Sequence, residues 1–278
     1  MTLEAAGSAR GTKNEGYCVG VVGASSLLGK ELVAVLKERE FPVSRLLEIE
    51  AGLDAALEPE LPIIDLDKAE PVGSSRPFNP EVRGDELDIA FVAVRPDPLP
   101  AFFRPQSSRP PLIIDLDRSL AALGQAVPRI ARLDQEALSS GGLSGEPTSA
   151  MVASAHPATI VLSSLLLRLA SQVEITTAVA QIFSPASQLG VRAIDELQRQ
   201  TVNLLSFQKI PRAIFGFQLA FNLLPRLTGS GSEGLSCLEN RLRGELEKYL
   251  AGRVPLPALK LFQAPVFYSL AASLYVET

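Results

Sequence analysis

The sequence contains one histidine and two cysteines, and acid–base or thiolate chemistry would be assigned to these side chains first. His156 lies in the stretch ASAHPATIV, among small residues and just before an apolar run with helical spacing. Such a histidine is either a general base or a loop residue that caps the following helix. Cys18 lies in an apolar run and Cys237 opens a charged one, without the spacing of metal ligands. We expect no metal site.

Glycines recur in the stretch GVVGASSLLG, which follows an apolar run and precedes a helical one. Between a strand and a helix, such glycines bring a pyrophosphate close to backbone N–H groups and to the helix N-terminus. The alternative is a tight turn whose glycines serve packing alone. If the stretch binds a dinucleotide, the predicted cofactor-binding residues are Gly20, Gly23, Ala24, Ser25, Ser26 and Gly29.

These residues need elements to position them, and β-type runs alternate with a helical pattern in the first 120 residues. We predict a helix over 30–39 that buries Leu32, Val35 and Leu36. Residues 50–84 are acidic and proline-rich, and we expect loops there. The alternation predicts a doubly wound parallel α/β sheet. The predicted strands cover residues 17–22, 46–49, 87–94 and 111–115.

The sequence of the second half of the chain predicts a layer of α+β type, which differs from the α/β sheet of the first half. Its predicted helices cover residues 158–170, 187–200 and 237–250, and its predicted strands cover residues 173–183, 259–267 and 270–277. The stretch SSGGLSGEPTS is a linker by composition. We therefore expect a mobile tail over 1–16, a dinucleotide-binding domain over 17–150 and an α+β dimerisation domain over 151–278.

Composition excludes several classes of function. The net charge is −5 and no cluster of lysines and arginines stands out, which argues against a nucleic-acid partner. Apolar runs stay well short of the roughly 18 residues that cross a bilayer. The N-terminal residues lack the apolar centre of a signal peptide. With two cysteines and no disulfide framework, the expected location is a reducing cytoplasm.

From Tyr17 onward, the sequence resembles the aspartate-semialdehyde dehydrogenase family. VGVVGASSLLG and the FP that follows resemble the family's GATGxVG opening, and DIAFVAV, LIIDLD, QIFS, LAFNLLP and PVFY match later segments in order. The resemblance implies a Rossmann-like domain, a second domain like that of glyceraldehyde-phosphate dehydrogenase, and a homodimer formed through the second domain. The family continues past the PVF strand, so the resemblance also implies a C-terminally shortened fold.

The resemblance implies a thioester mechanism, with a cysteine nucleophile, a histidine for proton transfer and an arginine for the substrate carboxylate. These family positions fall on Pro157, Leu270 and Gln263, which cannot supply that chemistry. The chain therefore resembles the Usg-type branch, whose members also depart from the cysteine motif. The substrate-side residues that the resemblance implies are His156, Gln181, Ser184, Arg241 and Glu245.

The resemblance implies NAD or NADP as the cofactor. The family contacts the 2′-phosphate of NADP with an Arg-Ser pair, and the matching residues here are EAGLD, Glu50–Asp54. Carboxylates repel a phosphate but can accept from the ribose hydroxyls of NAD, so NADP is disfavoured. Val94-Arg95 replaces a Gly-Gly pair that lines the nicotinamide side in the family.

Two functions remain open from the sequence. The first is a catalytically inactive homologue with a structural, regulatory or nucleotide-sensing role, as a homodimer or as a heterodimer with an active relative. The second is an NAD(P)-dependent oxidoreductase acting on an aldehyde or acyl phosphate in amino-acid biosynthesis. The second needs a nucleophile near residue 157, where the sequence offers only Ser154 and Thr159.

Overall fold

The computed structural model describes residues 16–49, 87–94, 111–122, 126–139, 151–225, 234–250 and 252–278. These residues fall in two compact units, and strand β6 (Met151–Ser154) is divided between them. The first unit contains β1 (Tyr17–Val22), α1 (Leu27–Glu38), β2 (Val43–Ile49), β3 (Ile89–Val92), β4 (Leu112–Asp115) and α2 (Ser119–Ala122). The second contains β5 (Val127–Arg129), α3 (Ala131–Ser139), α4 (Pro157–Ala170), β7 (Thr177–Ser184), the 3₁₀-helix η4 (Ala186–Leu189), α5 (Val191–Leu205), α6 (Leu235–Leu250), β8 (Ala258–Gln263) and β9 (Ala271–Glu277).

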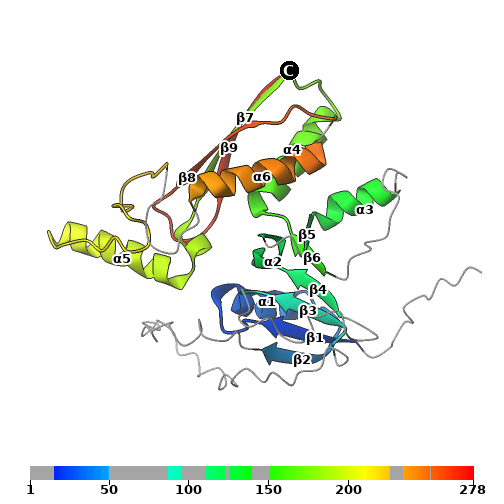
Figure 1. Ribbon diagram of the computed structural model, residues 1–278, viewed down its shortest axis with the longest axis horizontal. Helices are drawn as coiled ribbons and strands as arrows, with labels where there is room; N and C mark the ends of the chain where they lie inside the picture. The colour runs from blue at the N-terminus through cyan, green and yellow to red at the C-terminus, as the bar shows by residue number, and fades with distance from the viewer. Residues whose placement is uncertain are drawn as a thin grey trace, which may run out of the picture. The chain divides into compact units, whose positions relative to one another are not determined.

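Strands β1 to β4 belong to a six-stranded sheet with the order β2-β1-β3-β4-β6-β5 (Figure 1). β1 pairs in parallel with β2 and β3, and β3 pairs in parallel with β4. Apolar side chains of β1, among them Val19 and Val21, are completely buried, as a strand inside a parallel sheet requires. The prediction of a parallel α/β sheet is confirmed.

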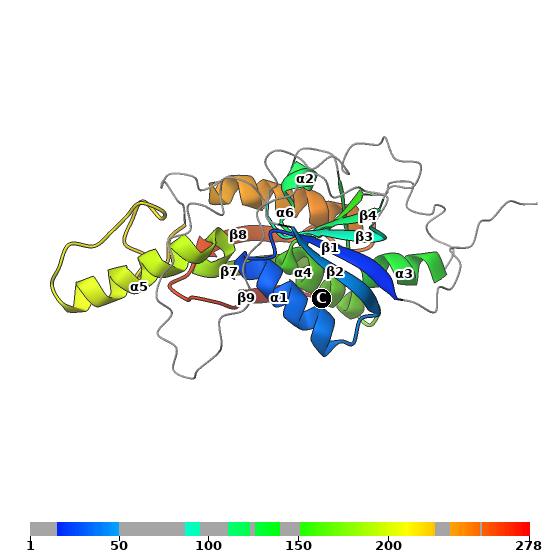
Figure 2. The same cartoon turned by 90° about the horizontal axis from the view of Figure 1, so that it is seen from below.

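Helix α1 covers one face of this sheet and lies alongside β1 and β2 (Figure 2). It begins at Leu27, three residues before the predicted start, because the Ser26 side chain caps it. Leu32 and Leu36 pack against the sheet as predicted. Val35 does not: it is 39% exposed, because Val33 takes the inward position instead.

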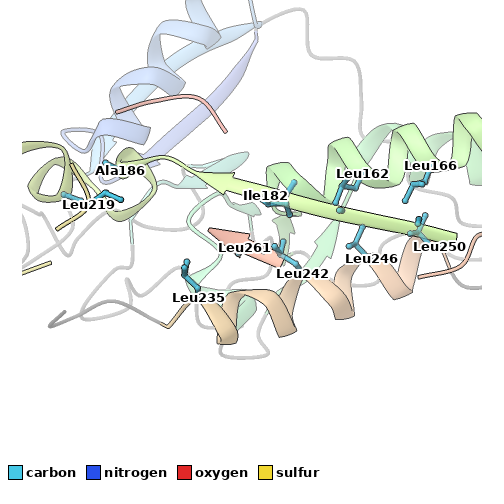
Figure 3. Packing of buried hydrophobic residues seen from close by; sticks show 14 of the residues in the cluster. Leu162, Leu166, Ile182, Ala186, Leu219, Leu235, Leu242, Leu246, Leu250 and Leu261 are labelled. Carbon is cyan, nitrogen blue, oxygen red and sulfur yellow. The ribbon is translucent and has the colours of Figure 1, made fainter. Parts of the chain in front are cut away.

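The second unit is built on a three-stranded sheet with the order β8-β7-β9. The central strand β7 pairs in parallel with β8 and antiparallel with β9. Alternation along β7 buries Ala178, Ala180 and Ile182 on one face, where α4 and α6 cover the sheet. Figure 3 shows the core between them, formed by Leu162 and Leu166 of α4, Leu242 and Leu246 of α6, and Ile182 of β7.

Some predicted boundaries in this unit were wrong, each for a local reason. The strand predicted from Val173 begins at Thr177, because the turn that closes α4 includes the Val173 N–H, which donates to the Leu169 carbonyl. The helix predicted over 187–200 is interrupted at Gly190, whose φ of +87° is outside the helical region. η4 precedes the break and α5 follows it, extending to Leu205.

The other helices and strands of this unit differ from their predicted boundaries by one to four residues. α4 and α6 start one and two residues before their predicted first residues, and β9 starts one residue after it. β8 ends at Gln263, four residues early, and Pro265 follows without a backbone N–H to continue the ladder. The predicted loops over 50–84 lie outside the described residues. Within the described ranges, no helix is both long and apolar enough to cross a membrane.

Candidate functional site

The glycine stretch forms the turn between β1 and α1 in the first unit. Gly23 has a φ of +80°, and its carbonyl accepts from the Ser26 N–H at 3.0 Å and from the Ser26 hydroxyl at 2.7 Å. Ser26 Oγ also accepts from the Gly29 N–H at 3.0 Å. Ser26 therefore both closes the turn and caps α1.

Packing alone accounts for the glycines at all three positions. A Cβ on Gly29 would lie 2.2 Å from the Gly23 oxygen, and a Cβ on Gly23 would lie 2.2 Å from Val94 Cγ1. Gly20 lies within β1, where a Cβ would approach Leu87 Cδ1 at 3.0 Å. The glycine pattern is thus required by the fold, whatever the turn binds.

The position of the turn nevertheless fits a dinucleotide. It lies at the carboxyl end of β1, the strand between β2 and β3, where the order of the sheet reverses. Open α/β sheets bind their ligands at such a point. The N-terminus of α1 begins there, and the positive end of its helix dipole fits the charge of a pyrophosphate. Glu50–Asp54 and Arg95 lie outside the described residues.

Asp115 is the buried carboxylate of the first unit, and the sequence did not single it out. It ends β4 and accepts from the N–H groups of Arg118 at 2.8 Å, Leu120 at 2.9 Å and Ala121 at 3.1 Å. Burial raises the pKa of Asp115 and the charge of Asp117 adds to that rise, while the three N–H groups act in the opposite direction. Its contacts make it the cap of α2.

In the second unit, His156 is the N-cap of α4 and is only 1% exposed. Its Nδ1 accepts from the Ala158 N–H at 3.1 Å. Pro157 follows as the first helical residue, where a missing N–H costs nothing. Of the two interpretations from the sequence, the structure contains the helix-capping one.

The capping contact also fixes the tautomer of His156. A neutral imidazole that accepts at Nδ1 carries its proton on Nε2, which must then donate. The structure places Gln188 Nε2 2.6 Å from His156 Nε2, and Gln188 Oε1 2.5 Å from the Ser184 hydroxyl that donates to it. Two N–H groups cannot face each other at that distance, so the amide must be turned to bring its oxygen to the ring and its NH₂ group to Ser184 Oγ. This orientation satisfies both contacts at once, which the opposite amide orientation would not.

Glu245 of α6 joins the same network. Its Oε2 accepts from the His156 backbone N–H at 2.9 Å and from Thr159 Oγ1 at 2.7 Å. The carboxylate therefore sits at the N-terminus of α4, where the helix dipole favours negative charge. This geometry links α6 to α4 and holds His156 by its backbone as well as its ring.

Ser184 and Gln263 complete the polar cluster where β7 and β8 end. Gln263 Nε2 donates to the Ser184 carbonyl at 2.9 Å, and both residues are buried. Gln263 stands where the family resemblance implies an arginine, and here its amide secures two paired strands. Leu270, at the implied histidine position, is half-buried immediately before β9.

The structure thus brings three of the five implied substrate-side residues together: His156, Ser184 and Glu245. Gln181 is not among them, because strand alternation places it on the exposed face of β7, opposite Ser184. The prediction of one pocket containing both was wrong. Arg241 is half-buried on α6, one helical turn before Glu245.

Gln188 is the network residue that sequence reasoning missed, and Thr159 was considered only as a possible nucleophile. The sequence did contain a signal that Thr159 belongs to the network, since it is a hydroxyl at the third position of a helix that otherwise begins with small apolar residues. Gln188 had none, because its role depends on the 3₁₀-helix that follows Pro185. In the ranges the structure describes, no group of histidine, cysteine, aspartate and glutamate side chains could hold a metal ion.

The chain is similar to USG-1 protein homologs and aspartate-semialdehyde dehydrogenases, although no protein-family profile matches it. Over 264 residues, it is 26% identical to the USG-1 protein homolog of Pseudomonas aeruginosa, covering 93% of the chain and 73% of that relative. It is 24% identical over 266 residues to the aspartate-semialdehyde dehydrogenase of Rickettsia bellii, with 94% of the chain and 73% of the relative covered.

Solved structures share the fold. A probable aspartate-semialdehyde dehydrogenase from Pseudomonas aeruginosa superposes with a TM-score of 0.70 at 26% identity, covering 94% of this chain and 74% of that one. At a greater distance, the aspartate-semialdehyde dehydrogenase with NADP from Candida albicans gives a TM-score of 0.53 at 14% identity, over 94% of this chain and 71% of that one.

Proposed function

We propose that the chain, which is similar to aspartate-semialdehyde dehydrogenases and USG-1 protein homologs, is a non-catalytic homologue that retains dinucleotide binding. Its role is then regulatory or structural, with the bound nucleotide as the signal. The alternative of a working oxidoreductase requires a nucleophile and a free base at the N-terminus of α4.

The observation that carries the proposal is the bonding state of His156. Its Nδ1, its Nε2 and its backbone N–H all contact other protein groups, and the ring is buried. A general base must reach a substrate proton within hydrogen-bond distance, either directly or through one water. His156 instead forms its hydrogen bonds with Ala158, Gln188 and Glu245.

The nucleophile side of the site supports the same proposal. Pro157, the residue after His156, has no side-chain group that could form a thioester. The two cysteines lie elsewhere: Cys18 in β1 of the first unit, and Cys237 exposed on the first turn of α6.

For the cofactor, we propose that residues 23–26 and the N-terminus of α1 hold the pyrophosphate of NAD or NADP. Their place at the switch point of the sheet supports this, as does the structural relative from Candida albicans that is described with NADP. A nicotinamide supplies hydride transfer when a substrate site accompanies it. The preference for NAD over NADP rests on Glu50–Asp54 and stays a prediction from the sequence.

Calorimetric titration of the purified chain with NAD and with NADP tests the cofactor proposal, and we expect saturable binding that is tighter for NAD. A parallel assay with aspartate semialdehyde, phosphate and each nicotinamide tests the loss of catalysis, and we expect no turnover above the rate without protein. The Rickettsia bellii relative serves as the positive control. Turnover by this chain would contradict the proposal, and absence of heat with both nucleotides would restrict the role to protein partners.

We further propose a homodimer through the exposed face of the β8-β7-β9 sheet. Val179 of β7 and Tyr275 of β9 are cross-strand partners and are 36% and 57% exposed. Phe183 and Phe262 stack at the same sheet, with ring centroids 5.9 Å apart. Apolar and aromatic side chains gathered on a sheet face mark an interaction surface.

A further inference from the structure

A cavity of about 1200 Å³ in the second unit shares no lining residue with the His156 network. It is bounded by β5, by α3 and by the last turns of α4 and α6. Acidic lining residues are Asp134 and Glu136. Its cationic lining residues are Arg129, Arg132, Arg168, Lys248 and Arg253.

The two acids are matched by two of the cations. Asp134 lies 3.7 Å from Arg129, and Glu136 lies 3.2 Å from Arg132. The five cations exceed the two acids by three charges, which are those of Arg168, Lys248 and Arg253. Lys248 Nζ donates to the Pro128 carbonyl at 2.6 Å and Arg253 donates to the Tyr249 carbonyl, and carbonyls leave the positive charge in place. This excess occurs on a chain whose net charge is −5.

The dipoles of α4 and α6 offset only part of this excess positive charge. Cations in the last turn of a helix complement its negative end, and Arg168 and Lys248 occupy such positions in α4 and α6. Each helix C-terminus carries roughly half a negative charge, so the two together offset about one of the three cations. About two positive charges remain for an external anion.

The electrostatic state of Lys248 agrees with this balance. Burial lowers the pKa of Lys248 and the charge of Arg129 lowers it further, while Asp134 and Glu245 act in the opposite direction. An anion bound in the cavity would favour the charged form of Lys248. One wall is apolar, with Leu133, Leu167 and Ala170.

We propose that this cavity binds a small organic phosphate. Its phosphate oxygens contact Arg168, Lys248 and Arg253, since guanidinium and ammonium groups are the usual partners of phosphate in proteins. The carbon portion packs on the apolar wall. The volume supports an organic ligand, because it exceeds what inorganic phosphate fills and lies just above the roughly 300–1,000 Å³ of small-molecule sites. The site is separate from the glycine turn and does not rest on the proposed function.

ATP is a suitable probe, because it combines a polyphosphate with an apolar base, and adenosine is its uncharged counterpart. Calorimetry with the full chain at low ionic strength should show saturable binding of ATP and none of adenosine. Arg168→Gln and Lys248→Gln should each raise the Kd for ATP about tenfold or more, since each removes a charge-assisted contact. Arg192→Gln removes the same charge from exposed α5 and should leave the Kd unchanged.

Denaturation midpoints of the variants show whether they are folded, and Arg168 is exposed, so its replacement leaves the core intact. Saturating NAD should not displace ATP. If neither ATP nor pyrophosphate binds, the proposal is overturned. It is also overturned if ATP binds equally well to the wild type and to both cavity variants, because the phosphate then lies elsewhere, such as at the glycine turn.

Discussion

At the scale of single residues, the hydrogen-bonding groups of His156 are all engaged in structural contacts. The ring closes the N-terminus of α4 through Nδ1 and orders Gln188 through Nε2, while the backbone N–H contacts Glu245. Each contact has a partner that would be left unsatisfied in a buried position. The stability of this corner of the second unit therefore depends on His156.

Replacing His156 by alanine should lower the free energy of unfolding by about 2 kcal/mol, because it removes a helix cap and a buried hydrogen bond. Asparagine at the same position keeps a capping oxygen, so His156→Asn should recover about half of that loss. Urea denaturation measures both. Equal stability of His156→Ala and the wild type would show that the network contributes nothing.

Tyr249 gives a second prediction at this scale. Its hydroxyl oxygen accepts from the buried Ile130 N–H at 2.7 Å, and burial is the main cause that raises its pKa to about 12. A raised pKa means that this contribution to stability is complete below pH 10, the ordinary value, and is lost as the pH rises through about 12.

Near-ultraviolet absorbance of tyrosinate follows this titration directly. The chain has four tyrosines, and we expect a component near pH 12 that Tyr249→Phe removes. The same variant should be less stable than the wild type at neutral pH and lose that disadvantage in strong alkali. A titration curve that keeps its last component in Tyr249→Phe would assign that component to another tyrosine.

At the scale of elements, two helical glycines differ in their surroundings. Gly29 of α1 packs on the Gly23 carbonyl, so Gly29→Ala should destabilise the protein by about 3 kcal/mol. Gly244 of α6 has open space around it, so Gly244→Ala should stabilise by roughly 0.5–1 kcal/mol through helix propensity. Chemical denaturation of the pair checks this, and shifts of the same sign would refute the packing argument.

These elements also show where sequence reasoning works. β1 is uniformly apolar because it is buried on both faces, whereas β7 alternates because it is buried on one face. Both strands could be recognised from the sequence. The break at Gly190 could not be predicted from the sequence. A glycine inside a helical pattern is recognised as a helix end only when its φ, here +87°, is known. His156 and Glu245, two of the predicted substrate-side residues, lie in one hydrogen-bonded network, whereas Gln181 lies on the exposed face of β7, because family likeness rather than the phase of its strand led to its selection.

At the scale of the whole molecule, the proposed dimer makes a simple prediction. Light scattering should give twice the 29.7 kDa mass of the chain, and Val179→Lys with Tyr275→Lys should reduce it to the monomer mass by placing charges on the paired face. Val161→Lys introduces the same charge on α4, at a position that is 51% exposed, and should leave the dimer intact. A monomeric wild type at micromolar concentration would contradict the proposal.

The contacts of β5 carry a consequence for how the chain reaches its fold. Ile130 and Pro128 are held by Tyr249 and Lys248, which follow them by 119 and 120 residues. A ribosome must therefore synthesise residue 249 before β5 acquires these two contacts in addition to its place beside β6, and closing so long a loop is slow. Nascent chains halted before residue 250 should leave β5 open to proteases, whereas chains released beyond that residue should protect it.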